Sequence, residues 1–121
     1  MLDYFNLSEF FPQDEKNLQC STREFLEEKV KPHVASWWEE GVFPTHLINE
    51  FGKRGLLGLN LPVEFGGQGL SALAYGLAMY ELERIDSALR SFVSVQSSLV
   101  MYPIFVYGSD EQKSYYLPKM A

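Results

Sequence analysis

Cysteine and histidine are scarce in this chain. Cys20 is the only cysteine among 121 residues, and the two histidines, His33 and His46, are well separated in sequence. A disulfide needs two cysteines, and a thiolate or imidazole metal site needs several ligands close together. The composition therefore excludes a disulfide framework within the chain, and we expect no zinc site. A reducing compartment fits this cysteine usage.

Positive charge is also in short supply. The chain has 10 Lys and Arg against 16 Asp and Glu, which gives a formal net charge of −6 and a pI near 4.8. An acidic protein is not attracted to nucleic acid or to an anionic membrane surface, so neither is an expected partner. The first ten residues are acidic and aromatic, unlike a basic targeting peptide. Hydrophobic residues make up 46% of the chain, which is ample for one core.

Charge is missing altogether from residues 91–109, between Arg90 and Asp110. A helix with one face in water normally carries Lys or Glu on that face. We therefore expect the polar side of this segment to face protein or a ligand. A membrane span is the other interpretation of such a length, but the serines, Gln96 and Pro103 lower its hydrophobicity and the sequence offers no second span. We expect no membrane span.

Helical spacing of 100° per residue divides this segment into two sides. The apolar side is predicted to hold Ile85, Leu89, Phe92, Leu99 and Val100, and the other side to hold Arg90, Ser94, Ser97 and Met101. One arginine with hydroxyls forms a stripe suited to an anion. Two plainer interpretations stay open: a central bundle helix whose serines bond to backbone, and an arginine in a surface ion pair.

Helix signals occur along the whole chain and strand signals hardly at all. Prolines or capping residues precede apolar periodic segments, and glycines follow them. The predicted fold is all-α, a helical bundle of about five or six helices in one domain, residues 1–121. The starts are at Pro12, Pro44, Ser71, Asp86 or Ser87, and Ser109, the ends include Gly41, Gly55 and Gly108, and the last helix meets Pro118.

The glycine-rich segment 55–69 is a candidate phosphate loop by composition. A phosphate loop joins a strand to a helix and carries a Lys with a hydroxyl, or a strict dinucleotide spacing. Both signatures are missing here. We expect a tight structural crossing between helices.

Three segments together resemble the N-terminal helical domain of acyl-CoA dehydrogenases. They are GLLGLNLPVEFGGQG at 55–69, ELERIDSALRS at 81–91 and YGSDEQKSYYLPKMA at 107–121. Their order and spacing are specific, and the resemblance covers nearly the whole chain. DYFNLSEFFPQDEKNLQ at 3–19 and LRSFVSVQSSLVMYPI at 89–104 are most similar to the glutaryl-CoA dehydrogenase branch.

The resemblance implies a parent enzyme with this helical domain, a middle β-domain and a C-terminal helical domain. Such an enzyme binds FAD, mainly through the two domains that lie outside these residues, and dehydrogenates an acyl-CoA. In the glutaryl branch, decarboxylation then gives crotonyl-CoA and carbon dioxide. The implied partners are electron-transferring flavoprotein and further subunits of a homotetramer. The implied location is the bacterial cytoplasm, or the mitochondrial matrix in a eukaryote, and we prefer the cytoplasm.

The family's catalytic base is a glutamate of the C-terminal domain, so no glutamate of this chain is expected to be catalytic. The expected contribution of this chain is one wall of the acyl pocket. By resemblance, Arg90 and Ser94 match the residues that hold the distal carboxylate of glutaryl-CoA, and Val95 and Leu99 match residues that line the acyl chain. One-turn spacing lets a guanidinium and a hydroxyl converge on one carboxylate.

Several alternatives stay open from the sequence. Glu83 or Asp86 could neutralise Arg90, in which case the substrate is a plain short-chain acyl-CoA. Val95 and Leu99 could belong to the ordinary core. A related acyl-CoA oxidase that uses oxygen shares this helical domain, and a stand-alone helical interaction module without catalysis is the interpretation from a different class.

Overall fold

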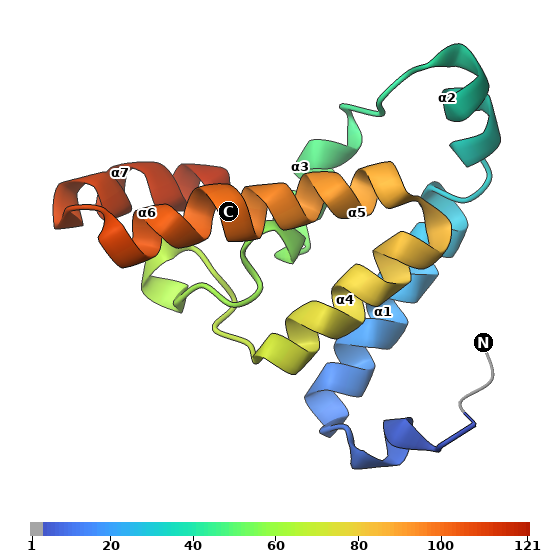
Figure 1. Cartoon of the computed structure of the whole chain (residues 1–121), viewed down its shortest axis with the longest axis horizontal. Coiled ribbons are helices and arrows are strands. Elements are labelled where there is room, and N and C mark those ends of the chain that lie inside the picture. Colours follow the sequence, from blue (N-terminus) through green and yellow to red (C-terminus); the bar gives the residue numbers. More distant parts are fainter. Residues whose placement is uncertain (1–3) are drawn as a thin grey trace.

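The computed structural model describes residues 4–121, which contain helices and turns but no strand (Figure 1). The predicted all-α fold is confirmed. Residues 1–3, which belong to the acidic and aromatic start, lie outside the described part. The helices are α1 (Gln13–Lys29), α2 (Val34–Glu40), α3 (Leu47–Lys53), α4 (Ala72–Ile85), α5 (Ser87–Ser94), α6 (Tyr102–Tyr107) and α7 (Asp110–Met120), with short 3-10 turns η1 (Leu7–Phe10), η2 (Leu56–Gly58) and η3 (Val63–Phe65), and a π-helical segment η4 (Val95–Met101).

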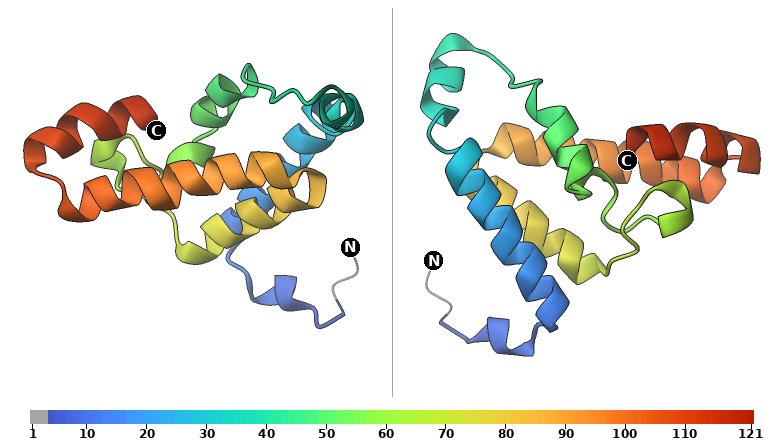
Figure 2. Two further views of the ribbon diagram at one scale, coloured as in Figure 1. Left: turned by 45° about the horizontal axis from the view of Figure 1, so that its top comes forward. Right: turned by 180° about the vertical axis from the view of Figure 1, so that it is seen from behind.

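The main core is built from α1, α3, the η2 crossing, α4 and α5, and within it α1 and α4 run alongside each other (Figures 1 and 2). Leu26 of α1 and Leu82 of α4 are fully buried, and Phe25 meets Phe51 of α3 edge to face at 6.0 Å. Burying one such side chain stabilises a fold by about 1.5–3 kcal/mol. The burial of Leu26 and Leu82 therefore holds α1 and α4 together, although the two helices are more than forty residues apart in sequence.

A buried carboxylate also joins α1 to α4. Glu81 has no exposed side-chain surface, and it accepts hydrogen bonds from Arg23 at 2.7 Å, Gln19 at 2.8 Å and Arg84 at 3.1 Å. Burial by itself raises the pKa of Glu81, but the hydrogen bonds from Arg23 and Gln19 outweigh it and hold that pKa below its ordinary value. Glu81 is thus a charged structural group and not a free base.

Three helices begin at the capping residues that the sequence predicted. The Ser71 hydroxyl accepts from the amide of Ala74 at the start of α4, and the Asp86 carboxylate accepts from the amide of Leu89 at the start of α5. Ser109 forms a full capping box with Gln112 at the start of α7. These interactions are local in sequence, which is why the residue pattern predicted them.

The glycine-rich segment closes on itself. Its amides bond to its own carbonyls, as in Gln68 to Gly58 at 3.0 Å and Gly69 to Leu61 at 2.8 Å. A Cβ at Gly67 would lie 2.1 Å from the carbonyl oxygen of Leu61, so only glycine fits there. The four leucines between Gly55 and Pro62 are buried. The segment is a tight crossing, as the sequence predicted.

A smaller core joins this crossing to the C-terminal helix through Leu61, Met101 and Leu117, all buried. The helix α7 folds back beside α6 (Figure 1). It does not end where it meets Pro118 but continues to Met120. A proline in the last turn removes only one helical hydrogen bond, and α7 gains contact there with Gly66, whose missing Cβ would lie 3.3 Å from the Cα of Pro118.

Candidate functional site

The charge-free segment forms most of one long helix, Ser87–Tyr107, in which α5, η4 and α6 follow one another without a break (Figure 1). By length and composition this helix could cross a membrane, and it is the one such helix among residues 4–121. Only 22% of its apolar window is buried. Most of the helix surface is therefore open to a ligand or to another part of a larger protein.

The middle of the long helix is π-helical over Val95–Met101. Pro103 supplies a physical reason. A proline ring clashes with the carbonyl four residues earlier and cannot donate to it, here the carbonyl of Leu99. A wider turn relieves this clash, and the amide of Tyr102 accordingly bonds five residues back, to the carbonyl of Ser97. Segments of this kind are frequent at functional sites.

This π turn changes which side chains face the core, and the predicted phase is wrong in its second half. Ser97 and Met101, expected on the open polar side, are 2% and 0% exposed. Leu99, expected on the apolar side, is 70% exposed. The 100° rule assumes 3.6 residues per turn, and the π-helical segment does not follow it. Ser97 therefore does not lie on the exposed stripe that the sequence predicted for it.

Arg90 and Ser94 are brought together as predicted. Nη1 of Arg90 lies 3.4 Å from Oγ of Ser94, one turn apart on α5. Nε of Arg90 donates at 2.5 Å to Glu83 of α4. That hydrogen bond is the main reason the pKa of Glu83 lies below its ordinary value. The Arg90 side chain stays 35% exposed, so the guanidinium, with five N–H donors, is accessible to an anion from solvent.

Val95 and Leu99 lie on the open face of the long helix. Val95 is 45% and Leu99 70% exposed, and Tyr102 and Val106 continue an exposed apolar stripe at spacings of three and four residues. Val95 and Leu99 therefore lie outside the core formed by the described residues 4–121. The face that carries them combines an apolar strip with a nearby cation and hydroxyl.

Comparison with known proteins adds to this geometry. The family described as "Acyl-CoA dehydrogenase, N-terminal domain" matches residues 12–121. This chain belongs to the acyl-CoA dehydrogenase family. A crystal structure of glutaryl-CoA dehydrogenase from Mycobacterium smegmatis is 46% identical with a TM-score of 0.89, covering 94% of this chain and 30% of that one. A second structure of glutaryl-CoA dehydrogenase from that organism, in complex with FADH2, is 44% identical with a TM-score of 0.92, covering 96% of this chain and 30% of that one.

The human mitochondrial short-chain specific acyl-CoA dehydrogenase is 37% identical over 102 residues, which is 84% of this chain and 25% of that protein. The chain thus spans between a quarter and a third of the length of these relatives. In this acyl-CoA dehydrogenase N-terminal domain, the long helix is the element that carries the predicted site.

Three contacts of the long helix were missed by sequence reasoning. The hydroxyl of Ser97 reaches the carbonyl of Leu57, Ser98 pairs with the hydroxyl of Tyr75 at 2.9 Å, and Gln96 donates to the carbonyl of Met120. The partners are between 23 and 40 residues apart in sequence. No local pattern signals such a pairing, because it depends on how the helices pack.

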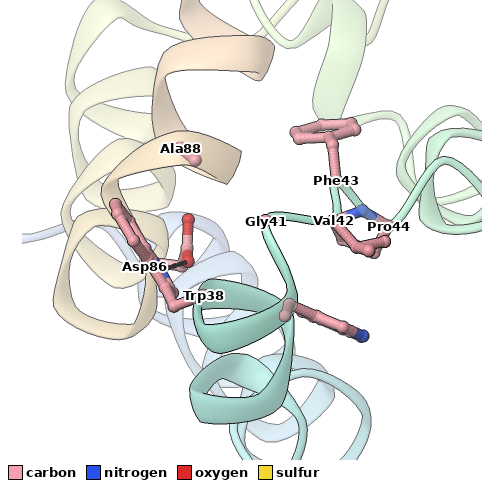
Figure 3. A pocket seen from close by; sticks show the side chains of 8 residues that line it. Trp38, Gly41, Val42, Phe43, Pro44, Asp86 and Ala88 are labelled. Carbon is pink, nitrogen blue, oxygen red and sulfur yellow. Dashed lines mark hydrogen bonds between the residues drawn. The ribbon is translucent and has the colours of Figure 1, made fainter.

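A cavity of about 220 Å³ opens at the start of the long helix (Figure 3). Apolar and aromatic side chains line most of it, and Asp86 lies at its edge with both carboxylate oxygens occupied, by Trp38 Nε1 and by the Leu89 amide. Arg90 and Ser94 are not among its lining residues, which are Trp37, Trp38, Gly41, Val42, Phe43, Pro44, Asp86 and Ala88. The cavity therefore belongs to the packing of α2 and is separate from the candidate site.

The described part of the acyl-CoA dehydrogenase domain offers no complete site for a metal or a dinucleotide. No group of three His, Cys, Asp or Glu side chains among residues 4–121 is placed to hold a metal ion. Amides of the glycine-rich loop donate to the loop's own carbonyls, as described above. The Leu61 carbonyl lies against Gly67, so no open space remains there for a phosphate group. These residues do not by themselves fit the flavin cofactor that the family resemblance implies.

Proposed function

We propose that this domain forms one wall of the acyl pocket of an FAD-dependent acyl-CoA dehydrogenase that acts on glutaryl-CoA. Arg90 and Ser94 would bind the distal carboxylate, and Val95 and Leu99 would line the acyl chain. The observation that carries this proposal is the meeting of the Arg90 guanidinium and the Ser94 hydroxyl at 3.4 Å, on a helix face whose next exposed side chains are apolar. Identity of 44–46% to glutaryl-CoA dehydrogenase supports it.

The ion pair with Glu83 is compatible with this role. Arg90 uses Nε for Glu83 and directs Nη1 toward Ser94, so the outer edge of the guanidinium is free to meet a carboxylate in two parallel hydrogen bonds. A second carboxylate beside Arg90 makes the local charge balance negative.

Catalytic groups are expected outside this chain. Glu81 is buried against two arginines, Glu83 is paired with Arg90, and Glu50 is paired with Lys53 at 3.1 Å. From the family resemblance, the base that removes the α-proton is proposed to lie in a further domain of the parent protein. FAD, which would supply the electron-accepting chemistry, is likewise proposed to bind mainly there.

Further parts of the proposal follow from the family resemblance. We infer that electrons pass to electron-transferring flavoprotein and that the complete protein is a homotetramer. A β-domain and a second helical domain would complete each subunit around the present residues. The location we propose is the cytoplasm of a bacterium, or the mitochondrial matrix for a eukaryotic source.

A second candidate substrate class is a short-chain acyl-CoA without a carboxylate. The close Arg90–Glu83 pair favours it, because an arginine neutralised within the protein needs no anionic ligand. The 37% identity to a short-chain specific acyl-CoA dehydrogenase also fits. In that case Arg90 is a structural residue, and Val95 and Leu99 alone shape the pocket.

The deciding experiment compares glutaryl-CoA with butyryl-CoA in the complete flavoenzyme, using wild type and Arg90→Gln. We expect kcat/KM for glutaryl-CoA to fall by roughly 10²–10³-fold, since a charge-paired hydrogen bond is lost, and that for butyryl-CoA to change by less than about threefold. Lys53→Gln is the matched control, because it removes one positive charge from an exposed ion pair on α3 that involves none of the proposed site residues. Equal losses on both thioesters would assign Arg90 a structural role and favour the short-chain alternative.

A further inference from the structure

Ser97 is a polar residue on the buried face of the long helix, between Val93 and Met101. It is 2% exposed, and its hydroxyl is 2.8 Å from the carbonyl oxygen of Val93 and 2.9 Å from that of Leu57. The first bond is the common one between a helical serine and the carbonyl four residues back. The second crosses to the 3-10 turn η2, forty residues earlier in the chain.

The acceptor at Leu57 is part of a rigid support. Leu57 is 5% exposed, and the following residue, Gly58, is enclosed: a Cβ there would lie 3.3 Å from the Cβ of Ala121 and 3.5 Å from the Cα of Gly67. The carbonyl of Gly58 also accepts from the amide of Gln68. The η2 turn can therefore move little, and a hydrogen bond to its Leu57 carbonyl fixes the segment that donates the bond.

The Ser97 hydroxyl attaches the π turn to this support, and that turn itself carries Val95 and Leu99 of the candidate site. Arg90 and Ser94 precede the turn on α5, whereas Leu99 lies within it. Whether the turn is α or π differs by about one residue, which rotates the side chains that follow by about 100°. The direction of Leu99 relative to Arg90 therefore depends on the width of this turn.

We infer that Ser97 is a positioning residue of the acyl pocket, whose hydroxyl holds the π turn against the Leu57 carbonyl and so sets the direction of Leu99 relative to Arg90 and Ser94. This inference rests on the proposed function. Pro103 explains why a wide turn is needed near this point, and Ser97 explains where the turn is held. Without the hydroxyl, the carbonyls of Val93 and Leu57 lose the single proton that they share, and the turn is free to shift along the helix.

The test uses the complete flavoenzyme with Ser97→Ala, and with Ser98→Ala as the matched control. Ser98 is the next residue of the same segment, but its hydroxyl pairs with Tyr75 of α4 and not with η2. Two readouts are needed: hydrogen–deuterium exchange of the peptide that covers residues 95–101, and kcat and KM for glutaryl-, butyryl- and hexanoyl-CoA.

For Ser97→Ala we expect exchange in residues 95–101 to accelerate about tenfold, because the turn opens more often. We expect the ratio of kcat/KM for glutaryl-CoA to that for butyryl-CoA to fall about tenfold, mainly through KM, and the preference between butyryl- and hexanoyl-CoA to change. Ser98→Ala should leave these ratios and this exchange within about twofold of wild type.

Ser97→Thr separates positioning from packing. Threonine keeps a hydroxyl that can bond the carbonyl four residues back, but it adds a methyl group to a filled site. We expect it to restore the substrate ratios toward wild type even where its Tm is lower. If Ser97→Ala yields no flavoenzyme, Ser97→Cys takes its place, with a similar size and a weaker donor.

Losses in Ser97→Ala that are equal for all three thioesters, or an equal effect of Ser98→Ala, would overturn the inference and leave Ser97 as a packing residue. Failure of the proposed function looks different. There the wild-type enzyme itself shows no preference for glutaryl-CoA, and Ser97 is then judged by the exchange of residues 95–101 and by the butyryl to hexanoyl ratio.

Discussion

Nε1 of Trp38 donates a 2.7 Å hydrogen bond to Oδ2 of Asp86, although the two residues are 48 positions apart. The other oxygen of the same carboxylate accepts from the amide of Leu89 at 2.8 Å and so caps the long helix. Asp86 is 7% exposed. Because α2 buries none of its side chains fully, this carboxylate is an important tie between α2 and the start of the functional helix.

Removing the two halves of this interaction should have graded effects on stability. Trp38→Phe removes the indole donor and part of the aromatic ring but leaves the cap, and we expect a loss of about 1 kcal/mol in the free energy of unfolding. Asp86→Ala removes the cap as well and should cost about 2–3 kcal/mol. Asp86→Ser keeps a capping oxygen and should fall between them. Urea unfolding of the purified variants checks the order. An equal cost for Trp38→Phe and Asp86→Ala would contradict the capping role.

Glu81 and Glu83, both on α4, allow the contributions of a buried and an exposed ion pair to stability to be compared within one helix. Glu81→Gln should destabilise the fold by about 2 kcal/mol, since Glu81 is buried with hydrogen bonds from Arg23 and Gln19. Glu83→Gln, which breaks an exposed pair with Arg90, should change stability by less than about 1 kcal/mol.

The pH dependence of stability distinguishes the same variants. The folded-state pKa of Glu81 is lowered, so its contribution is complete above the ordinary glutamate pKa of about 4.3 and is lost as the pH falls through the lower folded value. Unfolding measured from pH 7 down to pH 3 should show a shallower loss in Glu81→Gln than in wild type. A parallel pair of curves would mean that Glu81 does not contribute as a carboxylate.

Glycines 67 and 76 should respond oppositely to alanine. Gly67→Ala places a Cβ 2.1 Å from the carbonyl oxygen of Leu61, which requires the crossing to open, and we expect a loss of more than about 3 kcal/mol or failure to fold. Gly76 lies in α4 with open space around its Cβ position, so Gly76→Ala should stabilise by about 0.5–1 kcal/mol. Thermal unfolding of both variants would show the opposite shifts in Tm. A tolerated alanine at Gly67 would contradict the tight crossing.

The proline in the long helix gives a structural prediction. Pro103→Ala restores a backbone donor and removes the ring that clashes with the carbonyl of Leu99. We expect the residues before position 103 to tighten toward α geometry, with a hydrogen bond from the new amide to Leu99 and a lower exposed fraction for Leu99. A crystal structure of the variant checks this. An unchanged π segment would mean that Ser97 alone holds it.

The sequence was sufficient for those parts of the structure that depend on near neighbours. The caps at Ser71, Asp86 and Ser109 and the closed loop around Gly67 follow from residue type and spacing alone, and so did the meeting of Arg90 and Ser94 one turn apart. The assignment of their roles stays a prediction.

The parts that the sequence could not provide involve distant partners or a changed helical period. Nothing near Ser97 indicates that its hydroxyl bonds to Leu57, and nothing near Glu81 indicates Arg23. The buried position of Met101 and the exposed position of Leu99 were missed because a regular period was assumed through Pro103. A proline within a charge-free helix is the one signal that could have warned of this.

The π turn also bears on how such a domain evolves. Its two flanks are held separately, by the Asp86 cap on one side and by the packing of Ile104 and Phe105 against the smaller core on the other. A substitution at an exposed position of Val95–Met101 can therefore redirect Leu99 while Arg90 and the surrounding core keep their places. Substrate preference can then diverge among descendants through changes in a few neighbouring codons, at little cost to the inherited scaffold.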